Sequence, residues 1–174
     1  MVAAAEQARD VGFTCVGITG GEAFMLPWFP EMLVEIAGIL PTVALTNATL
    51  FTDGVLRRLE PLAGLDAALQ ISLDSDQPTR NDEFRGPKNF ATVLAAIPKL
   101  LERGIKVRIA TTVEDQTDDE LARRCDLHRG LGISDDDHVV RPVGRPGRAA
   151  TAGMAGGPGP AGALPELTLT RRGR

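Results

Sequence analysis

The sequence predicts an α/β fold, a partial (β/α) barrel or an open sheet of about five parallel strands. Short apolar or β-branched runs alternate along the 174 residues with longer segments that carry apolar residues at helical spacing. Strands that alternate with helices form a parallel sheet with right-handed crossovers. Five such units fit either a doubly wound sheet or most of a (β/α) barrel with its helices outside.

The first half of the chain contains five predicted elements. They are a helix at 3–12, a strand at 13–19, a helix at 26–40, a strand at 42–46 and a helix at 51–62. The first helix is alanine-rich and ends at Gly12, a natural terminator. The second opens with a proline and has an apolar stripe, and its Trp28 and Phe29 are expected to pack in the core, with stacking at the rim of a pocket as the alternative. Thr52 or Asp53 caps the third.

The second half continues the alternation, with a long polar loop at 75–88 between its first strand and its first helix. Its elements are a strand at 65–74, a helix at 89–104, a strand at 105–113, a helix at 117–132 and a last strand at 137–144. Pro98 should kink or interrupt its helix, because proline lacks the amide hydrogen, and Gly104 should close it. Thr117 and Glu120 have the spacing of a capping box.

The end of the chain differs in composition from the rest. It is rich in glycine, proline and alanine and shows no apolar periodicity. We therefore expect one ordered domain over 1–148 and a disordered tail over 149–174.

Composition excludes several classes of protein. The net charge of -4 argues against a general nucleic-acid binder. No apolar run has the length of a membrane span and the start lacks a signal-peptide pattern, so we expect a cytoplasmic protein without membrane contact. Cys15 and Cys125 are expected to be buried or inert, and their spacing assigns no metal ligands. His128 and His138 are expected at the surface or at a helix end.

Polar residues follow the first two predicted strands, at the edge where parallel folds place their sites. Gly20, Gly21 and Glu22 follow the first strand. A turn of this kind offers carbonyls and a carboxylate, which are acceptors suited to an ammonium group. Asn47 follows the second strand and can both donate and accept. The alternatives are a tight turn with an exposed acid at Glu22 and an Asx-turn at Asn47.

The third strand end and the loop after it offer the opposite chemistry. Ser72 and Asp74 come at the end of the strand, and Arg80 and Arg85 lie in the polar loop. An arginine there could bind a carboxylate in bidentate fashion, although Asp74 could equally cap the loop and the arginines could be solvated. Taken together, the strand ends offer handles for both charged groups of an α-amino acid.

These motifs also resemble a known family. The segments "GITGGEAF", "ALTNATL", "QISLDSDQPTRNDEFRGPKNF" and "HVVRPVGRPGRA" occur in the order seen in radical S-adenosylmethionine (radical SAM) enzymes, especially those that modify peptides or proteins. The resemblance covers roughly residues 12–149. It implies a TIM-like partial barrel, SAM and a [4Fe–4S] cluster as cofactors, and a 5′-deoxyadenosyl radical generated from SAM.

The resemblance also assigns roles to individual residues. It implies that Gly20, Gly21 and Glu22 bind the methionyl amino group of SAM. Ser72 and Arg85, with Arg80 as the competing candidate, would hold the SAM carboxylate. The remaining cofactor-binding positions at the strand ends would be Asn47 and Asp74, and the strand around 139–143 would contact adenine.

The sequence departs from the family at Ala23, where proline is usual, and above all in its cysteines. The family holds its cluster with three cysteines in a Cys-x3-Cys-x2-Cys loop, and this sequence has no such loop. We therefore expect a fragment that lacks the first strand and is inactive as written, whose full form would act on an unknown peptide or protein. The alternative is a non-catalytic remnant that binds SAM or docks a partner chain, which could supply the missing strand. A flavodoxin-like or phosphate-binding domain is a third reading.

Overall fold

The computed structural model describes residues 1–113 and 117–142, which form one five-stranded parallel sheet. Its strands are β1 (Val16–Ile18), β2 (Thr42–Thr46), β3 (Ala67–Ser72), β4 (Lys106–Val113) and β5 (His138–Pro142). Each strand pairs in parallel with the next along the chain, so their order in the sheet is their order in the sequence. The predicted parallel sheet is confirmed.

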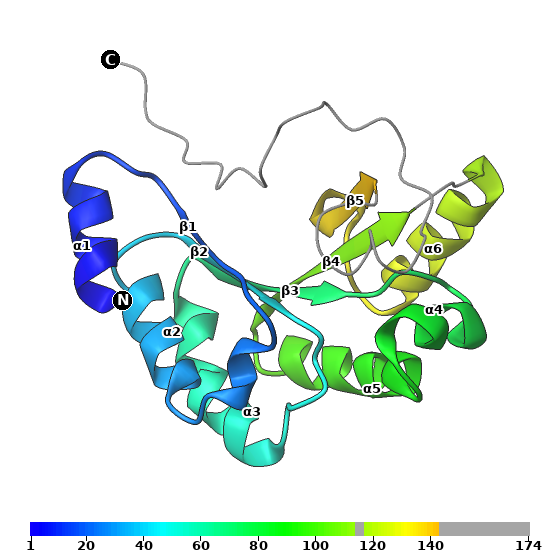
Figure 1. Cartoon of the computed structure of the whole chain (residues 1–174), viewed down its shortest axis with the longest axis horizontal. Coiled ribbons are helices and arrows are strands. Elements are labelled where there is room, and N and C mark those ends of the chain that lie inside the picture. The colour runs from blue at the N-terminus through cyan, green and yellow to red at the C-terminus, as the bar shows by residue number, and fades with distance from the viewer. Residues whose placement is uncertain (114–116, 143–174) are drawn as a thin grey trace.

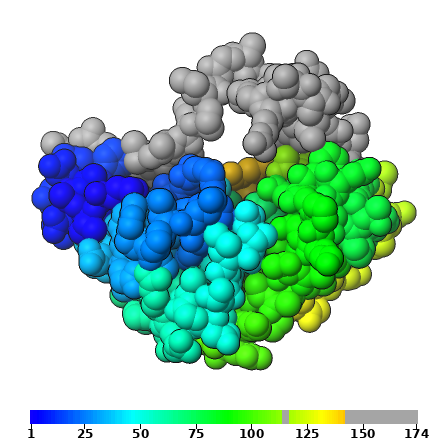
Figure 2. All heavy atoms as spheres, turned by 60° about the horizontal axis from the view of Figure 1, so that its bottom comes forward, coloured from blue at the N-terminus to red at the C-terminus, as the bar shows by residue number. Residues whose placement is uncertain are grey.

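The helices lie mainly on one side of this sheet. They are α1 (Val2–Asp10), α2 (Phe29–Ala37), α3 (Asp53–Leu59), α4 (Pro78–Arg85), α5 (Asn89–Leu101) and α6 (Asp118–Gly130), with short 3-10 turns η1 (Ala23–Met25), η2 (Glu60–Gly64) and η3 (Asp135–Asp137). Right-handed crossovers between strands in sequential order put every helix on the same face. Figure 1 shows α2, α3 and α5 beneath the curved sheet, and Figure 2 shows them as a continuous surface. This arrangement is that of a partial barrel, not of a doubly wound sheet.

Strand residues alternate between the helix-covered face and the opposite face. On β4, Val107, Ile109 and Thr111 are buried, whereas Arg108 and Thr112 on the other face are more exposed. The largest fully buried apolar side chains come from the helices and the third strand region: Phe29, Leu33, Ile36, Leu56, Leu59, Leu62, Leu69, Ile71, Leu73, Ile97 and Leu100. This core fixes the helices against the sheet and leaves the carboxyl ends of the strands to form a polar edge.

The predicted helix signals at the ends of the elements are largely confirmed. Gly12 has a φ of 92°, in the region that favours glycine after a helix. The Thr52 hydroxyl accepts from the amide of Val55, so Thr52 and not Asp53 caps α3. Both bonds of the Thr117–Glu120 capping box are present.

Three expectations were wrong. The polar loop predicted at 75–88 contains α4, which begins at Pro78 and has no apolar stripe that periodicity could detect. Helix α5 continues through Pro98 to Leu101, so the interruption expected there is absent, and the alternative of a kink stays a prediction. Trp28 is 53% exposed, whereas Phe29 is buried as expected.

Some expectations lie outside the described residues. These are the disordered tail at 149–174 and the last two residues of the predicted strand at 137–144. Among the residues that are described, no helix is long and apolar enough to cross a membrane.

Candidate functional site

The Gly20–Gly21–Glu22 turn follows β1 at the carboxyl edge of the sheet. A Cβ atom added at Gly20 or Gly21 would meet no other atom within 4 Å. Nothing in the described chain therefore fills the space beside these two glycines, and a ligand could approach the backbone there. The two glycines leave the turn bare where a side chain would otherwise cover it.

The Glu22 carboxylate ties this turn to the end of β2. Its Oε1 accepts from Thr46 Oγ1 at 2.9 Å and from the Phe24 amide at 3.1 Å, and its Oε2 accepts from the Asn47 amide at 2.7 Å. Each carboxylate oxygen can accept about two hydrogen bonds. Oε2 accepts one bond and therefore has capacity for one more donor. Because its carboxylate accepts three hydrogen bonds from the protein, Glu22 is not the exposed acid of the alternative interpretation.

Asn47 connects β2 to the next helix layer. Its Oδ1 accepts from the amide and the hydroxyl of Thr49, at 2.9 and 2.7 Å, so the Asx-turn alternative is confirmed for the side chain. Its backbone carbonyl accepts from Asn89 Nδ2 at 3.4 Å. The Asn47 amide nitrogen Nδ2 has no partner among residues 1–113 and 117–142.

Two buried asparagines continue the connection to β3. Asn81 Nδ2 donates to Asn89 Oδ1 at 3.0 Å, and Asn81 Oδ1 accepts from the backbone amide of Asp74 at 3.0 Å. Asn81 is 0% exposed and Asn89 4% exposed. Buried amides need partners for their donors and acceptors, and these two supply each other.

Asp74 links the end of β3 to β4 and to α4. Its Oδ1 accepts from the Thr112 amide at 2.8 Å, and its Oδ2 accepts from Arg85 Nε at 2.5 Å. The Arg85 side chain keeps 27% of its area exposed. Among the side-chain nitrogens of Arg85, Nε alone has a hydrogen bond within the described chain, so both terminal guanidinium nitrogens can donate to a ligand.

The two candidate arginines have different surroundings. Arg80 Nη1 pairs with Glu120 in the first turn of α6 at 2.5 Å, whereas Arg85 Nε pairs with Asp74, two residues after β3. The bonds from the Thr117 amide and from Arg80 hold the pKa of Glu120 below its ordinary value, although burial opposes them. This geometry favours Arg85 over Arg80 for a ligand at the strand-end edge.

The strand-end series is the name we give to Glu22, Asn47, Asn89, Asn81, Asp74 and Arg85, which are joined by these bonds. It spans the carboxyl ends of β1, β2 and β3, and the Thr112 amide adds β4. Ser72 lies at the same edge as the last residue of β3, partly exposed, and its hydroxyl has no bond within the described chain.

Sequence reasoning missed Asn81 and Asn89. The spacing of Asn81 and Arg85, four residues apart, would place them on one face of a helix, but the segment was predicted to be a loop and so gave no such signal. Asp82 of the same helix supports this arrangement by accepting from the amides of Lys88 and Phe90, at 2.6 and 2.7 Å. The bond from Phe90 is the main cause of a lowered Asp82 pKa, which burial opposes.

A metal cluster is not supported by this chain's own cysteines. Cys15 lies one residue before β1, at the amino edge of the sheet, and Cys125 lies on α6. The whole sequence has these two cysteines and no third, whereas an iron–sulfur cluster of the expected kind needs three convergent thiolates. Within the described residues, no group of three histidine, cysteine or acidic side chains could hold a metal ion.

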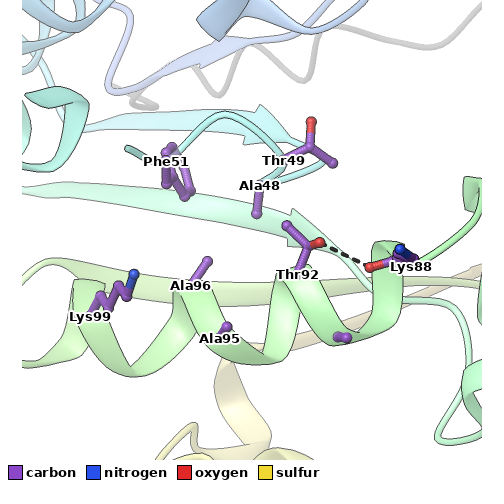
Figure 3. Close-up of a pocket in the computed structure, with 9 residues that line it drawn as sticks. Ala48, Thr49, Phe51, Lys88, Thr92, Ala95, Ala96 and Lys99 are labelled. Atoms are coloured by element: carbon purple, nitrogen blue, oxygen red, sulfur yellow. Dashed lines mark hydrogen bonds between the residues drawn. The ribbon is translucent and has the colours of Figure 1, made fainter. Parts of the chain in front are cut away.

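Two hollows lie outside the strand-end series. One, of about 430 Å³, runs along α5 between Ala48 and Phe51 on one side and Ala95 and Ala96 on the other, with Lys88 and Lys99 near its ends (Figure 3). The second, also about 430 Å³, lies at the amino ends of the strands beside Cys15. Neither is lined by any of the predicted site residues.

Comparisons with known proteins identify relatives. The chain is 31% identical over 116 residues to the sporulation killing factor maturation protein SkfB of Bacillus subtilis (strain 168), a match that covers 64% of this chain and 27% of SkfB. The chain thus spans about a quarter of that protein's length.

The fold also matches solved structures. SuiB of Streptococcus suis bound to S-adenosylmethionine aligns with a TM-score of 0.68 and 23% identity, over 80% of this chain and 32% of SuiB. SuiB bound to the precursor peptide SuiA aligns with a TM-score of 0.63 and 21% identity, over 76% of this chain and 30% of that one. An anSMEcpe structure with bound AdoMet aligns with a TM-score of 0.58 and 15% identity, over 80% of this chain and 39% of that one. At these identities the likeness shows the fold, which confirms the partial barrel.

A protein-family model also matches the chain. The model of the radical SAM superfamily matches residues 1–127, which include β1 to β4 and all members of the strand-end series. The match covers well over half of the 174 residues, and this chain therefore belongs to the radical SAM superfamily.

Proposed function

We propose that this chain is the SAM-binding core of a radical SAM enzyme that modifies a peptide or protein. The observation that carries the proposal is the strand-end series, which holds acceptors and donors in fixed places along one edge of the sheet. SAM-bound SuiB has the same fold, which supports the choice of ligand. The peptide part of the proposal draws on SkfB, a maturation protein, and on the SuiB structure with its precursor peptide.

The two ends of the series suit the two charged groups of the methionyl moiety. At the β1 end, the open space beside Gly20 and Gly21 and the spare capacity of Glu22 Oε2 suit an ammonium group. At the β3 end, Arg85 offers its terminal nitrogens and Ser72 its hydroxyl to a carboxylate. Asp74 would hold the guanidinium in place through Nε, and Asn81 would hold Asp74.

The cofactor chemistry itself comes from outside these residues. In the family, bound SAM supplies a carbon-centred radical when a [4Fe–4S] cluster reduces it. Since this chain has only two cysteines, on different sides of the fold, the cluster ligands would have to lie outside these 174 residues. The task of the described residues is to bind and orient the methionyl group.

Calorimetric titration of the 174-residue chain with SAM tests this proposal. Arg85→Ala should weaken SAM binding by roughly 10- to 100-fold, because a charge-assisted hydrogen bond is worth about 1.5–3 kcal/mol. The matched control is Arg80→Ala on the same helix, which removes an arginine that pairs with Glu120 instead. Arg80→Ala should leave the SAM affinity unchanged.

Titration with a second ligand tests whether Arg85 contacts the carboxylate of SAM. Decarboxylated SAM lacks the group that Arg85 would bind, so Arg85→Ala should cost it little affinity. If SAM fails to bind at millimolar concentration, the proposal fails. Equal losses for Arg85→Ala and Arg80→Ala, or equal losses for the two ligands, would show that Arg85 does not hold the carboxylate.

A further inference from the structure

A second group of polar side chains lies where α6 and β5 meet β4. Cys125 of α6 has its Sγ 3.9 Å from His138 Nδ1, and His138 Nε2 is 2.9 Å from Thr111 Oγ1. His138 opens β5, and Thr111 is a buried residue of β4. His138 therefore has neighbours that the sequence did not reveal. A thiol, an imidazole and a hydroxyl form a linear series contributed by three elements.

The bonds of Thr111 determine which imidazole nitrogen carries the proton. The Thr111 hydroxyl donates its one hydrogen to the Leu73 carbonyl at 2.8 Å. It can therefore only accept from His138, so Nε2 of the neutral ring must carry hydrogen. The Nδ1 lone pair is then free to accept, and it faces the Cys125 thiol. This orientation puts a proton acceptor beside the sulfur.

The surroundings keep His138 neutral and thus able to accept a proton. Burial lowers the pKa of His138, the charge of Arg124 lowers it further, and Asp135 opposes both. The ring of His128, 2% exposed, packs edge to face against His138 with ring centres 4.3 Å apart. Cys125 itself is only partly buried.

We propose that Cys125 is a modification site at which a hydroperoxide forms a sulfenic acid, with His138 as proton acceptor and Thr111 as a positioning residue. The thiol proton moves to His138 Nδ1, and the sulfur attacks one peroxide oxygen. An S–O bond forms as the O–O bond breaks, so the sulfur loses two electrons and the peroxide is reduced. The departing oxygen anion, which is hydroxide when the reagent is hydrogen peroxide, takes the proton from His138 and leaves as water or as the corresponding alcohol. This site does not depend on SAM binding.

Treating the 174-residue chain with hydrogen peroxide and trapping sulfenic acid with dimedone tests the proposal. Mass spectrometry then gives the labelling rate at Cys125 and at Cys15 in the same sample. His138→Gln should lower the rate at Cys125 at least about tenfold, in keeping with the loss of a general base. The rate at Cys15 should not change, which shows that the reagent dose and the fold are the same.

A second pair of variants tests the role of Thr111. Thr111→Val removes the acceptor that fixes the His138 tautomer and should slow labelling at Cys125. Thr111→Ser keeps the hydroxyl and should restore the wild-type rate, which a merely structural role for the side chain would not predict. Alkylation by iodoacetamide should rank the variants in the same order. Equal Cys125 rates in wild type and His138→Gln, or no dimedone adduct at Cys125, would overturn the proposal.

Discussion

Two buried polar regions of this molecule are held together by different chemistry. The strand-end series is centred on two neutral amides, Asn81 and Asn89, whose bonds do not depend on pH. The α6–β5 region is centred on two imidazoles, His128 and His138, which become charged in acid. His128 Nδ1 is buried and has no hydrogen-bond partner within the described chain. The two central amides of the first region are uncharged and bonded to each other, whereas the imidazoles of the second are ionisable and one of them lacks a partner for its Nδ1.

The difference shows which part of the fold should be rigid. Asn81 and Asn89 connect the ends of β2 and β3 through α4 and α5, so they fix the edge that we propose binds SAM. The histidines connect α6 to β5, one of the two edge strands of the described sheet, and His138 also contacts Thr111 of β4. Conditions that disturb the imidazoles should therefore loosen one margin of the sheet and leave the strand-end series intact.

Removing Asn81 should have the largest effect on stability. Asn81→Leu leaves the Asp74 amide and Asn89 Oδ1 buried without partners, and each such group costs about 1–3 kcal/mol. We expect the free energy of unfolding to fall by about 4 kcal/mol, measured by urea denaturation with circular dichroism. The loss should be the same at pH 5 and pH 7, because no ionisable group is removed.

Thr79→Leu is the matched control for this change. Thr79 lies on α4 two residues before Asn81 and is exposed, so the same new side chain should change the free energy of unfolding little. A loss for Asn81→Leu as small as that of Thr79→Leu would mean that the amide series does not stabilise the edge.

Only part of the strand-end series could be predicted from the sequence. The carboxyl ends of parallel strands share one edge, so Glu22, Asn47 and Asp74 could be placed together from their positions after apolar runs. Helix α4 could not be predicted from the sequence, because the segment "PTRNDEFR" is polar throughout. Asn81 is buried by the position of this helix in the fold, and no apolar stripe marks the buried face. Without that helix, the sequence could not show which of Arg80 and Arg85 lies beside Asp74.

The histidine pair could not be found from the sequence for a different reason. His128 and His138 are ten residues apart on different elements, and only the packing of α6 beside β5 brings their rings together. No periodicity within one element encodes such a contact.

Acid should have the second-largest effect, and it should act on the histidine region. Burial, with help from His138 and Arg124 and against Asp135, lowers the pKa of His128 from its ordinary 6.5 to about 4. The unfolded chain therefore binds more protons between these values, and stability falls as the pH falls from 6.5 towards 4. The full loss amounts to about 3 kcal/mol, since one pKa unit is worth about 1.4 kcal/mol.

Urea denaturation at several pH values between 7 and 4.5 measures this loss. His128→Leu should remove most of the slope, because the group that takes up the proton is gone. Carboxylates with a lowered pKa, such as Asp82, contribute only at lower pH, where their stabilisation is lost on protonation. A slope in His128→Leu as steep as in the wild type would assign the effect to other groups.

Thr111→Val should have the smallest of these effects, and it tests the border between the two regions. The Thr111 hydroxyl donates to the carbonyl of Leu73, the residue before Asp74, and accepts from His138. Valine has the same shape but leaves both partners unsatisfied, so we expect a loss of about 2 kcal/mol in the free energy of unfolding. If the regions are independent, the losses of Thr111→Val and Asn81→Leu should add in the double variant to within about 0.5 kcal/mol. A larger deviation would show that the histidine region and the strand-end series are coupled through β3.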